Sequence, residues 1–417
     1  MNFKTFQLHP AVAAGTIAAG YTEPTPIQSR AIPSVMARND LIGLAQTGTG
    51  KTAAFVLPIL NRIIAGKRGT PRALIVAPTR ELVEQIHETI ENLGRKTGLR
   101  SLAIYGGVSI APQIKAVKKA DIIVACPGRL LDHLGRKTVD LSSLEMLVLD
   151  EADHMFDMGF LPDIRRILKH IPAKRQTLLF SATMPAEIRK LAEESLTEPV
   201  TVQIGVTAPA ETVSHALYPV DQKQKTPLLV QLLKQTGTGS VLVFTRTKHR
   251  AKRLGEQLSR AGYKTASLQG NLSQNRRKDA INGFRNGTYQ VLVATDIAAR
   301  GIDIANVSHV INYDIPNTPD AYIHRIGRTG RATCTGDAFT LITKEDSQMV
   351  RAIDRIMGSK IERKVLPDFN YLPPAAQNDF GSRSAEQFSR QGKKQKAAAA
   401  PPQKKQQLKR KPVRSGQ

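Results

Sequence analysis

The chain has 417 residues, 41% of them hydrophobic, which is long enough for about two or three domains and sufficient for sizeable cores. Its formal net charge of +25 at pH 7 favours a polyanionic partner, because phosphates that bind cations release condensed counterions. No run of about 18 apolar residues could cross a bilayer, and Cys126 and Cys334 lack metal-ligand spacing, which fits a reducing, cytoplasmic location. We therefore expect nucleic acid rather than a membrane as the partner, with the oligomeric state left open.

In chain order, the first informative segment is Ala45-Gln46-Thr47-Gly48-Thr49-Gly50-Lys51-Thr52, which follows the apolar run 41–44 and is expected to open a helix. Glycines let backbone N–H groups converge on anionic oxygens, Lys51 adds a positive charge near the terminal phosphates, and the Thr52 hydroxyl can bind Mg²⁺. Ala45 replaces the first glycine of the general GxxxxGK[ST] pattern, so the loop is a variant. The segment predicts a nucleoside triphosphate site; the alternative is a glycine-rich turn that binds no phosphate.

Four short apolar runs in the first half predict strands that are buried on both faces, as in a parallel sheet covered by helices. They are residues 73–77, 122–125, 147–149 and 177–180. Polar segments follow them at 78–81, 126–129, 150–153 and 181–183. Because open α/β sheets place their ligands at the carboxyl ends of the strands, we expect all four polar segments along one edge.

Two acids in one of these segments have the chemistry for splitting a phosphoanhydride bond. Asp150 follows its strand directly, so its carboxylate can reach Mg²⁺ at the sheet edge near Thr52, directly or through water. The adjacent Glu151 can then act as a general base on the attacking water. The alternative is that these acids stabilise the amino end of the next helix.

A second set of apolar runs, at 241–244, 290–294, 310–313 and 338–342, predicts a second parallel-sheet domain without a phosphate loop. We expect domains over residues 1–206 and 213–366, joined by a linker over 207–212, and a tail over 367–417. Residues 383–417 hold eleven Lys or Arg against the single acid Glu386, which predicts a disordered basic tail that increases the affinity for RNA. A solubilising tail without a specific partner is the alternative.

The second half also carries a cluster of arginines spaced three residues apart within 322–331. On a helix or turn this spacing lets Arg328 and Arg331 point into the same space, and a guanidinium can hold phosphate oxygens at two points. From spacing alone, these side chains could bind ATP, bind nucleic-acid phosphates or remain solvated.

The order of these motifs resembles the DEAD-box RNA helicases over residues 1 to about 365. The motifs are AQTGTGKT (45–52), PTREL (78–82), Gly106-Gly107, PGR (127–129), DEAD (150–153), SAT (181–183), TDIAARGID (295–303) and HRIGRTGR (324–331). Within the family the chain looks most like the bacterial RhlE group. The resemblance implies two tandem RecA-like α/β domains and an ATP-dependent RNA helicase.

The resemblance also implies roles in the ATP site, with ATP and Mg²⁺ as cofactors. Gln28 would read the adenine, on which Phe3 would stack, and the loop 45–52 would hold the phosphates. Lys51 would contact phosphates, while Thr52 and Asp150 would hold Mg²⁺. Glu151 would activate water, Arg328 and Arg331 would reach the γ-phosphate, His324 would couple hydrolysis to domain closure, and Asp303 would contact the ribose.

Further residues would connect ATP to RNA. Ser181 and Thr183 would bond to the DEAD segment, at Asp153, and link the ATP state to strand separation. The RNA contacts implied by the family are Arg80, Gly107, Gly128, Arg129, Thr245, Gly270, Thr295 and Arg300. Two residues depart from the family pattern. Cys126 stands where threonine is usual, so we expect a hydroxyl contact to RNA to be missing there, and Gln269 stands where histidine is common.

We therefore expect two domains that are open without ligand and that close around ATP and RNA together, which completes the active site. Local separation of short RNA duplexes would follow, with little sequence preference, plausibly in ribosome assembly or RNA decay. An ATP-gated RNA clamp or annealing protein is compatible with the same motifs. A DNA translocase is disfavoured, because the motif set resembles the RNA-directed family.

Overall fold

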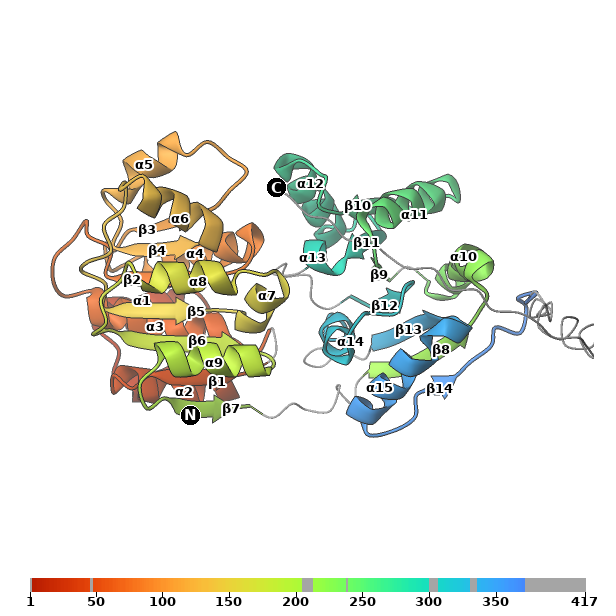
Figure 1. Cartoon of the computed structure of the whole chain (residues 1–417), viewed down its shortest axis with the longest axis horizontal. Helices are drawn as coiled ribbons and strands as arrows, with labels where there is room; N and C mark the ends of the chain where they lie inside the picture. The colour runs from red at the N-terminus through yellow and green to blue at the C-terminus, as the bar shows by residue number, and fades with distance from the viewer. Residues whose placement is uncertain are drawn as a thin grey trace, which may run out of the picture. The chain divides into compact units, whose positions relative to one another are not determined.

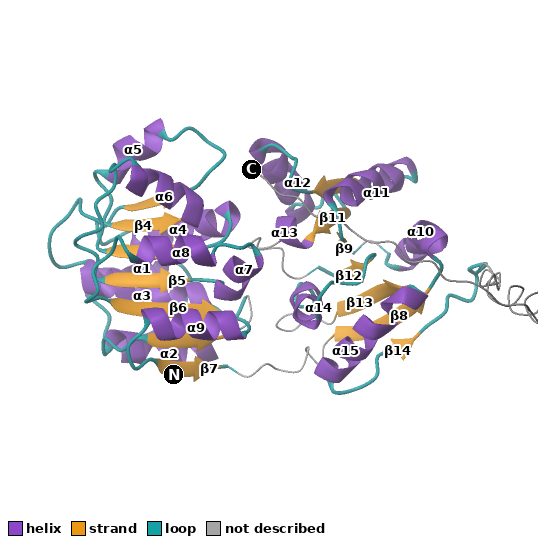
Figure 2. Cartoon of the chain, viewed as in Figure 1, coloured by secondary structure: helices purple, strands orange, loops and turns teal. Residues whose placement is uncertain are grey.

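The protein is described by a computed structural model that covers residues 2–45, 48–204, 213–237, 239–299, 307–330 and 336–371. Within these ranges the chain forms two parallel β-sheets, each flanked by helices on both faces (Figures 1 and 2). The expected class, two α/β domains of RecA-like type, is confirmed.

The first sheet contains β1 (Leu41–Leu44), β2 (Ala73–Val76), β3 (Ser101–Ile104), β4 (Ile122–Ala125), β5 (Met146–Leu149), β6 (Gln176–Ser181) and β7 (Val200–Gln203). In the described residues their order is β3-β4-β2-β5-β6-β1-β7, and all neighbours are parallel. The four apolar runs expected in this half form β2, β4, β5 and β6. The phosphate loop follows β1, and the DEAD segment follows β5, so both lie at carboxyl ends of the strands.

Two helical layers bury this sheet because its side chains alternate between two cores. In β5, Met146 and Val148 belong to one core, whereas Leu147 and Leu149 belong to the other. The first layer consists of η1 (Phe3–Phe6), α1 (Pro10–Ala18), α2 (Pro26–Met36), α3 (Lys51–Ile63) and α4 (Arg80–Gly94). The second consists of α5 (Ala111–Val117), α6 (Pro127–Gly135), α7 (Ala152–Asp157), α8 (Leu161–Leu168) and α9 (Ala186–Ser195).

The second sheet repeats the topology of the first. It contains β8 (Val213–Pro219), β9 (Val241–Thr245), β10 (Thr265–Leu268), β11 (Val291–Thr295), β12 (His309–Asn312), β13 (Gly336–Ile342) and β14 (Glu362–Arg363). The described order is β10-β11-β9-β12-β13-β8-β14, again parallel throughout. The four apolar runs expected in this half form β9, β11, β12 and β13.

One face of this sheet packs against α10 (Lys225–Gln235) and α11 (Lys248–Arg260), and the short η2 (Gln222–Gln224) leads into α10. The other face packs against α12 (Gln274–Arg285), α13 (Asp296–Ala299), α14 (Pro319–Ile326) and α15 (Ser347–Met357), which η3 (Lys344–Asp346) precedes. As in the first domain, polar segments follow strands of this sheet at their carboxyl ends.

The chain stays packed on the second domain a few residues beyond the expected boundary at 366. Phe369 and Tyr371 lie against the core beside α10 and α11, and the side chain of Gln224 donates to the Asn370 carbonyl at 2.7 Å. The expected linker over 207–212 and the basic stretch 383–417 lie outside the described residues. Among the helices that are described, none has the length and apolar character needed to span a membrane.

Candidate active site

The phosphate loop closes on itself at the start of α3. Ala45, the residue after β1, is buried. Lys51 is the first residue of α3, and its Nζ donates to the Ala45 carbonyl at 2.8 Å. Gly48 and Gly50 have φ of 86° and 93°, the left-handed region that glycine adopts without strain. A Cβ at Gly50 would lie 2.5 Å from the Gln28 amide, so only glycine fits there. Gln46 and Thr47 lie outside the described residues, whereas Gly48 to Thr52 are described.

Gln28 connects this loop to the segment before α2. Its side chain accepts from the Thr25 N–H at 2.9 Å and donates to the Gly50 carbonyl at 3.0 Å, and it is only 2% exposed. Phe3 lies in the apolar core, packed edge-on against Phe6 and Tyr21 with ring centroids 5.7 and 5.8 Å apart. The two residues expected at the adenine thus belong to one domain, but adenine reading by Gln28 and stacking on Phe3 stay predictions.

Asp150 and Glu151 are buried at the carboxyl end of β5, at 2% and 3% exposure. Burial raises the pKa of Asp150 to about 7, partly offset by Lys51, and the neighbouring Glu151 raises it further. The Asp150 carboxyl is therefore less acidic than that of an ordinary aspartate.

Glu151 pairs with a residue that the sequence reasoning did not single out. Its Oε2 lies 2.9 Å from Nδ1 of His154. Burial opposes ionisation, but His154, Lys51 and Arg328 together lower the pKa of Glu151 to about 2. Although Glu151 occupies the N-cap position of α7, its side chain makes no capping hydrogen bond. A carboxylate at this position still places negative charge at the amino end of α7, so the expected alternative, stabilisation of the helix end, stays a prediction beside the hydrolytic role.

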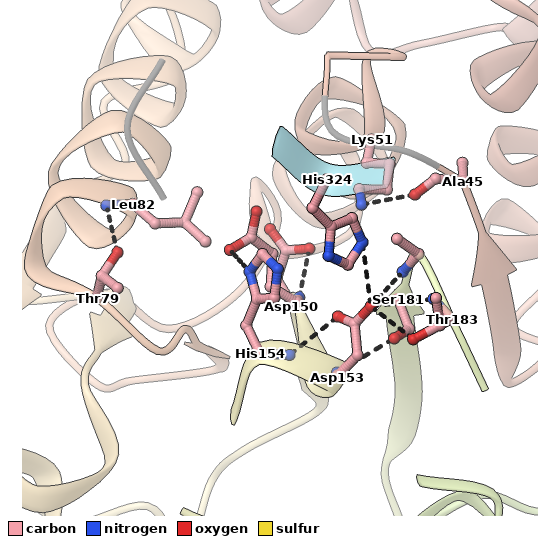
Figure 3. Close-up of polar contacts among 12 residues, drawn as sticks. Ala45, Lys51, Thr79, Leu82, Asp150, Asp153, His154, Ser181, Thr183 and His324 are labelled. Atoms are coloured by element: carbon pink, nitrogen blue, oxygen red, sulfur yellow. Dashed lines mark hydrogen bonds and ion pairs between the residues drawn. The ribbon is translucent and has the colours of Figure 1, made fainter. Parts of the chain in front are cut away.

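Asp153 is the point where three segments meet (Figure 3). Its Oδ2 accepts from the Ala182 and Thr183 N–H groups and from the Thr183 hydroxyl, at 3.1, 3.0 and 3.1 Å. Its own N–H donates to the Ser181 hydroxyl at 3.2 Å. The structure thus brings together the expected coupling residues Asp153, Ser181 and Thr183.

His324 of the second domain reaches the same carboxylate. Its Nε2 lies 3.9 Å from Oδ2 of Asp153, and its ring packs edge-on against His154 with centroids 5.0 Å apart. Burial opposes ionisation of Asp153, but His154, His324 and Lys51 lower its pKa to about 2. One contact between the two domains therefore involves a buried, ionised carboxylate of the DEAD segment.

Arg328 lies just after α14, 5% exposed, and its charge contributes to the lowered pKa of Glu151. A cavity of about 20 Å³, which is about the size of one water, is lined by residues of both domains, among them His154, His324 and Arg328. Arg331 and Asp303 lie outside the described residues, so their expected roles stay predictions.

Arg325 holds the helix that carries His324. Its guanidinium donates to both oxygens of Asp296 at 2.6 and 2.7 Å, and to Asn312 Oδ1 and the Asp314 carbonyl at 3.0 and 2.7 Å. This side chain is 2% exposed, so the pairing is buried, and each of the three guanidinium nitrogens has at least one partner. The sequence contained a signal for the pairing of Arg325 with Asp296, because the two residues lie in the motifs HRIGRTGR and TDIAARGID.

The expected RNA contacts of the first domain lie at the carboxyl ends of β2, β3 and β4. Arg80 and Arg129 each have a buried Nη1 without a partner among the described residues. Gly107 has a φ of 79°, and a Cβ at Gly107 or Gly128 would meet nothing within 4 Å. The open space at the two glycines leaves room for a phosphate backbone to approach the main chain, and the RNA contacts themselves stay predictions.

In the second domain, Thr245 and Thr295 end β9 and β11, and Gly270 follows β10 with open space around it. Arg300 lies outside the described residues. At the two departures from the family pattern, burial raises the pKa of Cys126 to about 12, and Gln269 accepts from the Asn271 N–H at 2.7 Å. Cys126 offers a protonated thiol rather than a hydroxyl beside the first-domain contacts.

Sequence reasoning also missed residues that join α4 to α12. Oε1 of Glu81 accepts from Gln274 Nε2 at 3.2 Å and from Arg277 Nε at 2.8 Å. Next to this pair, Glu84 lies 3.2 Å from Lys278. No local pattern marks these pairs, because their members are more than 190 residues apart in the chain.

Comparisons with known proteins agree with this geometry. Residues 25–191 match the DEAD/DEAH box helicase family, and residues 224–333 match the helicase conserved C-terminal domain. The chain is 45% identical over 371 residues to the DEAD-box ATP-dependent RNA helicase CshA of Bacillus licheniformis, covering 88% of this chain and 76% of that protein. The protein of the same name from Bacillus subtilis is 44% identical over 371 residues, with coverages of 88% and 74%.

Among solved structures, S. cerevisiae Dbp5 bound to RNA and ADP BeF3 is similar, with a TM-score of 0.78 and 30% identity. The match covers 94% of this chain and 99% of that one. Placement in the RhlE group is not tested by these relatives and stays a prediction.

Proposed function

This chain belongs to the family of DEAD-box ATP-dependent RNA helicases, and from that premise we propose how its own residues divide the work. The first domain binds the nucleotide, the second completes the site, and RNA binds across both. The observation that carries this assignment is the Asp153 carboxylate, which contacts the end of β6 in its own domain and lies near His324 of the other.

In the proposed nucleotide site, the N–H groups at the start of α3 and the Lys51 ammonium bind the ATP phosphates. Lys51 is held by the Ala45 carbonyl, so its charge is already positioned. Gln28 links the adenine side to the loop through Gly50, and Phe3 provides the aromatic face. Asp303 contacts the ribose. The family uses ATP, and preference for adenine follows from Gln28.

The residues present also fit Mg²⁺. The described residues contain no group of three or more His, Cys, Asp or Glu that could hold a metal by themselves. Mg²⁺ usually takes one or two protein ligands and fills its remaining positions with water and phosphate oxygens. Thr52 and Asp150 would hold it, because a hydroxyl and a carboxylate supply the oxygen ligands that Mg²⁺ prefers. The chemistry supplied by the ion is neutralisation of phosphate charge.

For hydrolysis, we assign the water-activating role to Glu151. The carboxylate is ionised at neutral pH, and His154 holds one of its oxygens at 2.9 Å. The other oxygen can accept a water proton as the water attacks the γ-phosphate. His154 is thus a positioning residue for the base. Arg328, and with it Arg331, would stabilise charge that develops on the transferred phosphoryl group.

RNA dependence follows from the division of these groups between two domains. Lys51 and Glu151 are in one domain, and Arg328 and Arg331 are in the other, so hydrolysis requires closure. Arg80, Gly107, Gly128 and Arg129, with Thr245, Gly270, Thr295 and Arg300, would contact RNA phosphates and 2′-hydroxyls. Such contacts carry little sequence information.

We propose that the contacts among Asp153, Ser181 and Thr183 couple ATP binding and hydrolysis to the residues that contact RNA. A bent single strand held across both domains cannot pair with its complement, so short duplexes separate locally. Hydrolysis then releases the strand. A clamp or annealing role uses the same closure and differs in the fate of the bound strand.

The experiment that tests the assignment compares ATP turnover with RNA, with DNA and without polynucleotide. We expect RNA alone to stimulate turnover strongly. Equal rates in all three conditions would contradict the RNA-dependent closure. Stimulation by RNA without separation of a short duplex would favour the clamp or annealing role, and equal stimulation by DNA would favour a DNA translocase.

The cellular role proposed here is remodelling of ribosomal precursors or of RNA in decay, in the cytoplasm. The net charge of +25, much of it in residues 383–417, supports binding to structured RNAs by charge. Crosslinking the protein to RNA in cells and sequencing the attached transcripts would separate the two pathways.

A further inference from the structure

Arg80, one of the expected RNA contacts, is held in place by two neighbours of its own domain. Its Nε donates to Oε1 of Glu84 at 3.2 Å. Its guanidinium carbon lies 4.1 Å from the centroid of the Tyr105 ring, and Nη2 lies 3.4 Å from the Tyr105 hydroxyl. Nη1 is buried without a partner among the described residues. Glu84 and Tyr105 therefore fix the orientation of the Arg80 guanidinium.

Glu84 divides its two carboxylate oxygens between two sets of partners. Oε1 accepts from Arg80 and also from the Tyr105 hydroxyl at 2.7 Å. Oε2 lies 3.2 Å from Nζ of Lys278, on α12 of the second domain. The side chain of Glu84 is 21% exposed, against 50% for Lys278, so the carboxylate is the more enclosed partner.

The position of the Glu84–Lys278 pair distinguishes it from an isolated surface ion pair, which contributes little to stability. Glu81, one turn before Glu84 on α4, binds Gln274 and Arg277, which lie about one turn or less before Lys278 on α12. Glu84 and Lys278 thus extend a contact between the two domains that already contains a well-enclosed pair. Arg80, Tyr105 and Lys278 also lower the pKa of Glu84 against the opposing effect of its burial, so the carboxylate stays charged at neutral pH.

We propose that Glu84 is a positioning residue that couples RNA binding to domain closure, because it orients Arg80 with one oxygen and holds Lys278 of the second domain with the other. The inference rests on the proposed function, in which Arg80 contacts an RNA phosphate. Glu84 itself does not touch RNA, since its negative charge would repel phosphate. Glu84 fixes the orientation of the Arg80 guanidinium. Closure of the second domain stabilises this orientation, because Lys278 then holds the other Glu84 oxygen.

The test measures RNA-stimulated ATP turnover of the full chain with poly(U) as the RNA. Glu84→Gln should raise the half-saturating RNA concentration by about tenfold, because it weakens a charge-assisted hydrogen bond to Arg80. Lys278→Gln should raise it by about threefold, the range of a partly exposed pair. Turnover at saturating RNA should stay unchanged in both, which also shows that both variants are folded. The double variant should match Glu84→Gln alone, because Lys278 acts through Glu84.

The direction in which Glu84→Gln changes the half-saturating RNA concentration distinguishes an orienting role of Glu84 from a simple effect of its charge. Removing a negative charge beside an RNA track favours RNA electrostatically, so a charge effect alone would lower the half-saturating concentration. Glu88→Gln, on the exposed side of the same helix, and Lys252→Gln, whose partner is Glu256 on its own helix, are the matched controls and should change little.

An unchanged or lowered half-saturating concentration in Glu84→Gln overturns the proposal, as does full additivity in the double variant. A loss of turnover at saturating RNA would also overturn it, because it would place Glu84 in the hydrolytic step. If RNA fails to stimulate the wild-type chain, the proposed function fails instead. The two failures are therefore distinguishable.

Discussion

The imidazole Nε2 of His324 lies 3.9 Å from Oδ2 of Asp153. The first belongs to the last turn of α14 in the second domain, and the second belongs to the first turn of α7 in the first domain. Because the same oxygen accepts three hydrogen bonds from the residues after β6, a change at either domain reaches one shared carboxylate. The groups around that carboxylate, the basic tail and the one described cysteine can each be tested directly.

Glu151→Gln should keep ATP and RNA bound but slow hydrolysis by about 100-fold or more, the range expected when a general base is removed. The amide oxygen can still accept from His154, so the local geometry is retained. Single-turnover ATP hydrolysis and nucleotide binding measure the two effects separately. Asp163→Asn on the exposed part of α8, where Asp163 pairs with Arg166, is the control. Normal turnover in Glu151→Gln would show that another group activates the water.

Lys51→Ala should instead weaken nucleotide binding.

Thr183→Val should separate ATP hydrolysis from strand separation. The substitution keeps the shape of the side chain but removes the hydroxyl that donates to Asp153 at 3.1 Å. We expect RNA-stimulated ATP turnover to stay within about threefold of wild type, and unwinding of a short duplex to fall by about tenfold, the cost of a hydrogen bond to a charged group. Thr16→Val, which removes a buried hydroxyl in α1, is the control. Equal reductions in both assays would assign Thr183 to the hydrolytic step.

Removal of residues 383–417 should weaken RNA affinity and flatten its dependence on salt. Every phosphate that the tail neutralises on a single strand should contribute about 0.7 to the slope of log affinity against log salt, so the truncated chain should have a shallower slope. Turnover at saturating RNA should not change. A full-length variant with the eleven cations replaced by glutamine separates charge from length. A slope equal to that of the intact chain would assign the tail to solubility alone.

The thiol of Cys126 should react slowly with iodoacetamide in the folded protein. Burial raises its pKa to about 12 from an ordinary value of 9.0, so the folded state favours the protonated form. The corresponding stability is fully present below pH 9 and disappears as the pH rises towards 12. We expect labelling of a Cys334→Ser variant to be slow at pH 8 and to accelerate in urea. Fast labelling of the folded variant at pH 8 would mean that the thiol is accessible.

The central strands could be predicted from the sequence because each is a short apolar run with both faces buried. The predicted runs 73–77 and 290–294 correspond in this way to β2 (Ala73–Val76) and β11 (Val291–Thr295). The sequence did not predict β3, β7, β8, β10 and β14. Four of them are less buried, and β8 interrupts its apolar residues with Ser214 and His215. A continuous apolar run in the sequence indicates a strand that is buried on both faces, and a strand near the edge of a sheet is less buried.

The ATP site could also be predicted, because its residues follow strands in segments whose local geometry repeats wherever the motif occurs. Lys51 at the start of α3 and Asp150 after β5 are examples. His154 was missed despite lying three residues from Glu151. Its role depends on the turn of α7, which brings Nδ1 to the carboxylate.

The amino-acid sequence alone determined which chemical groups this protein has and on which strand ends they lie, because a strand, a turn and a helix N-terminus are local consequences of neighbouring residues. The tertiary structure alone decided which of those groups meet. Glu84 meets Lys278 and Asp153 meets His324 only because the two domains place α4 and α7 beside α12 and α14. Such contacts depend on how whole domains pack, and nothing in the adjacent residues specifies them.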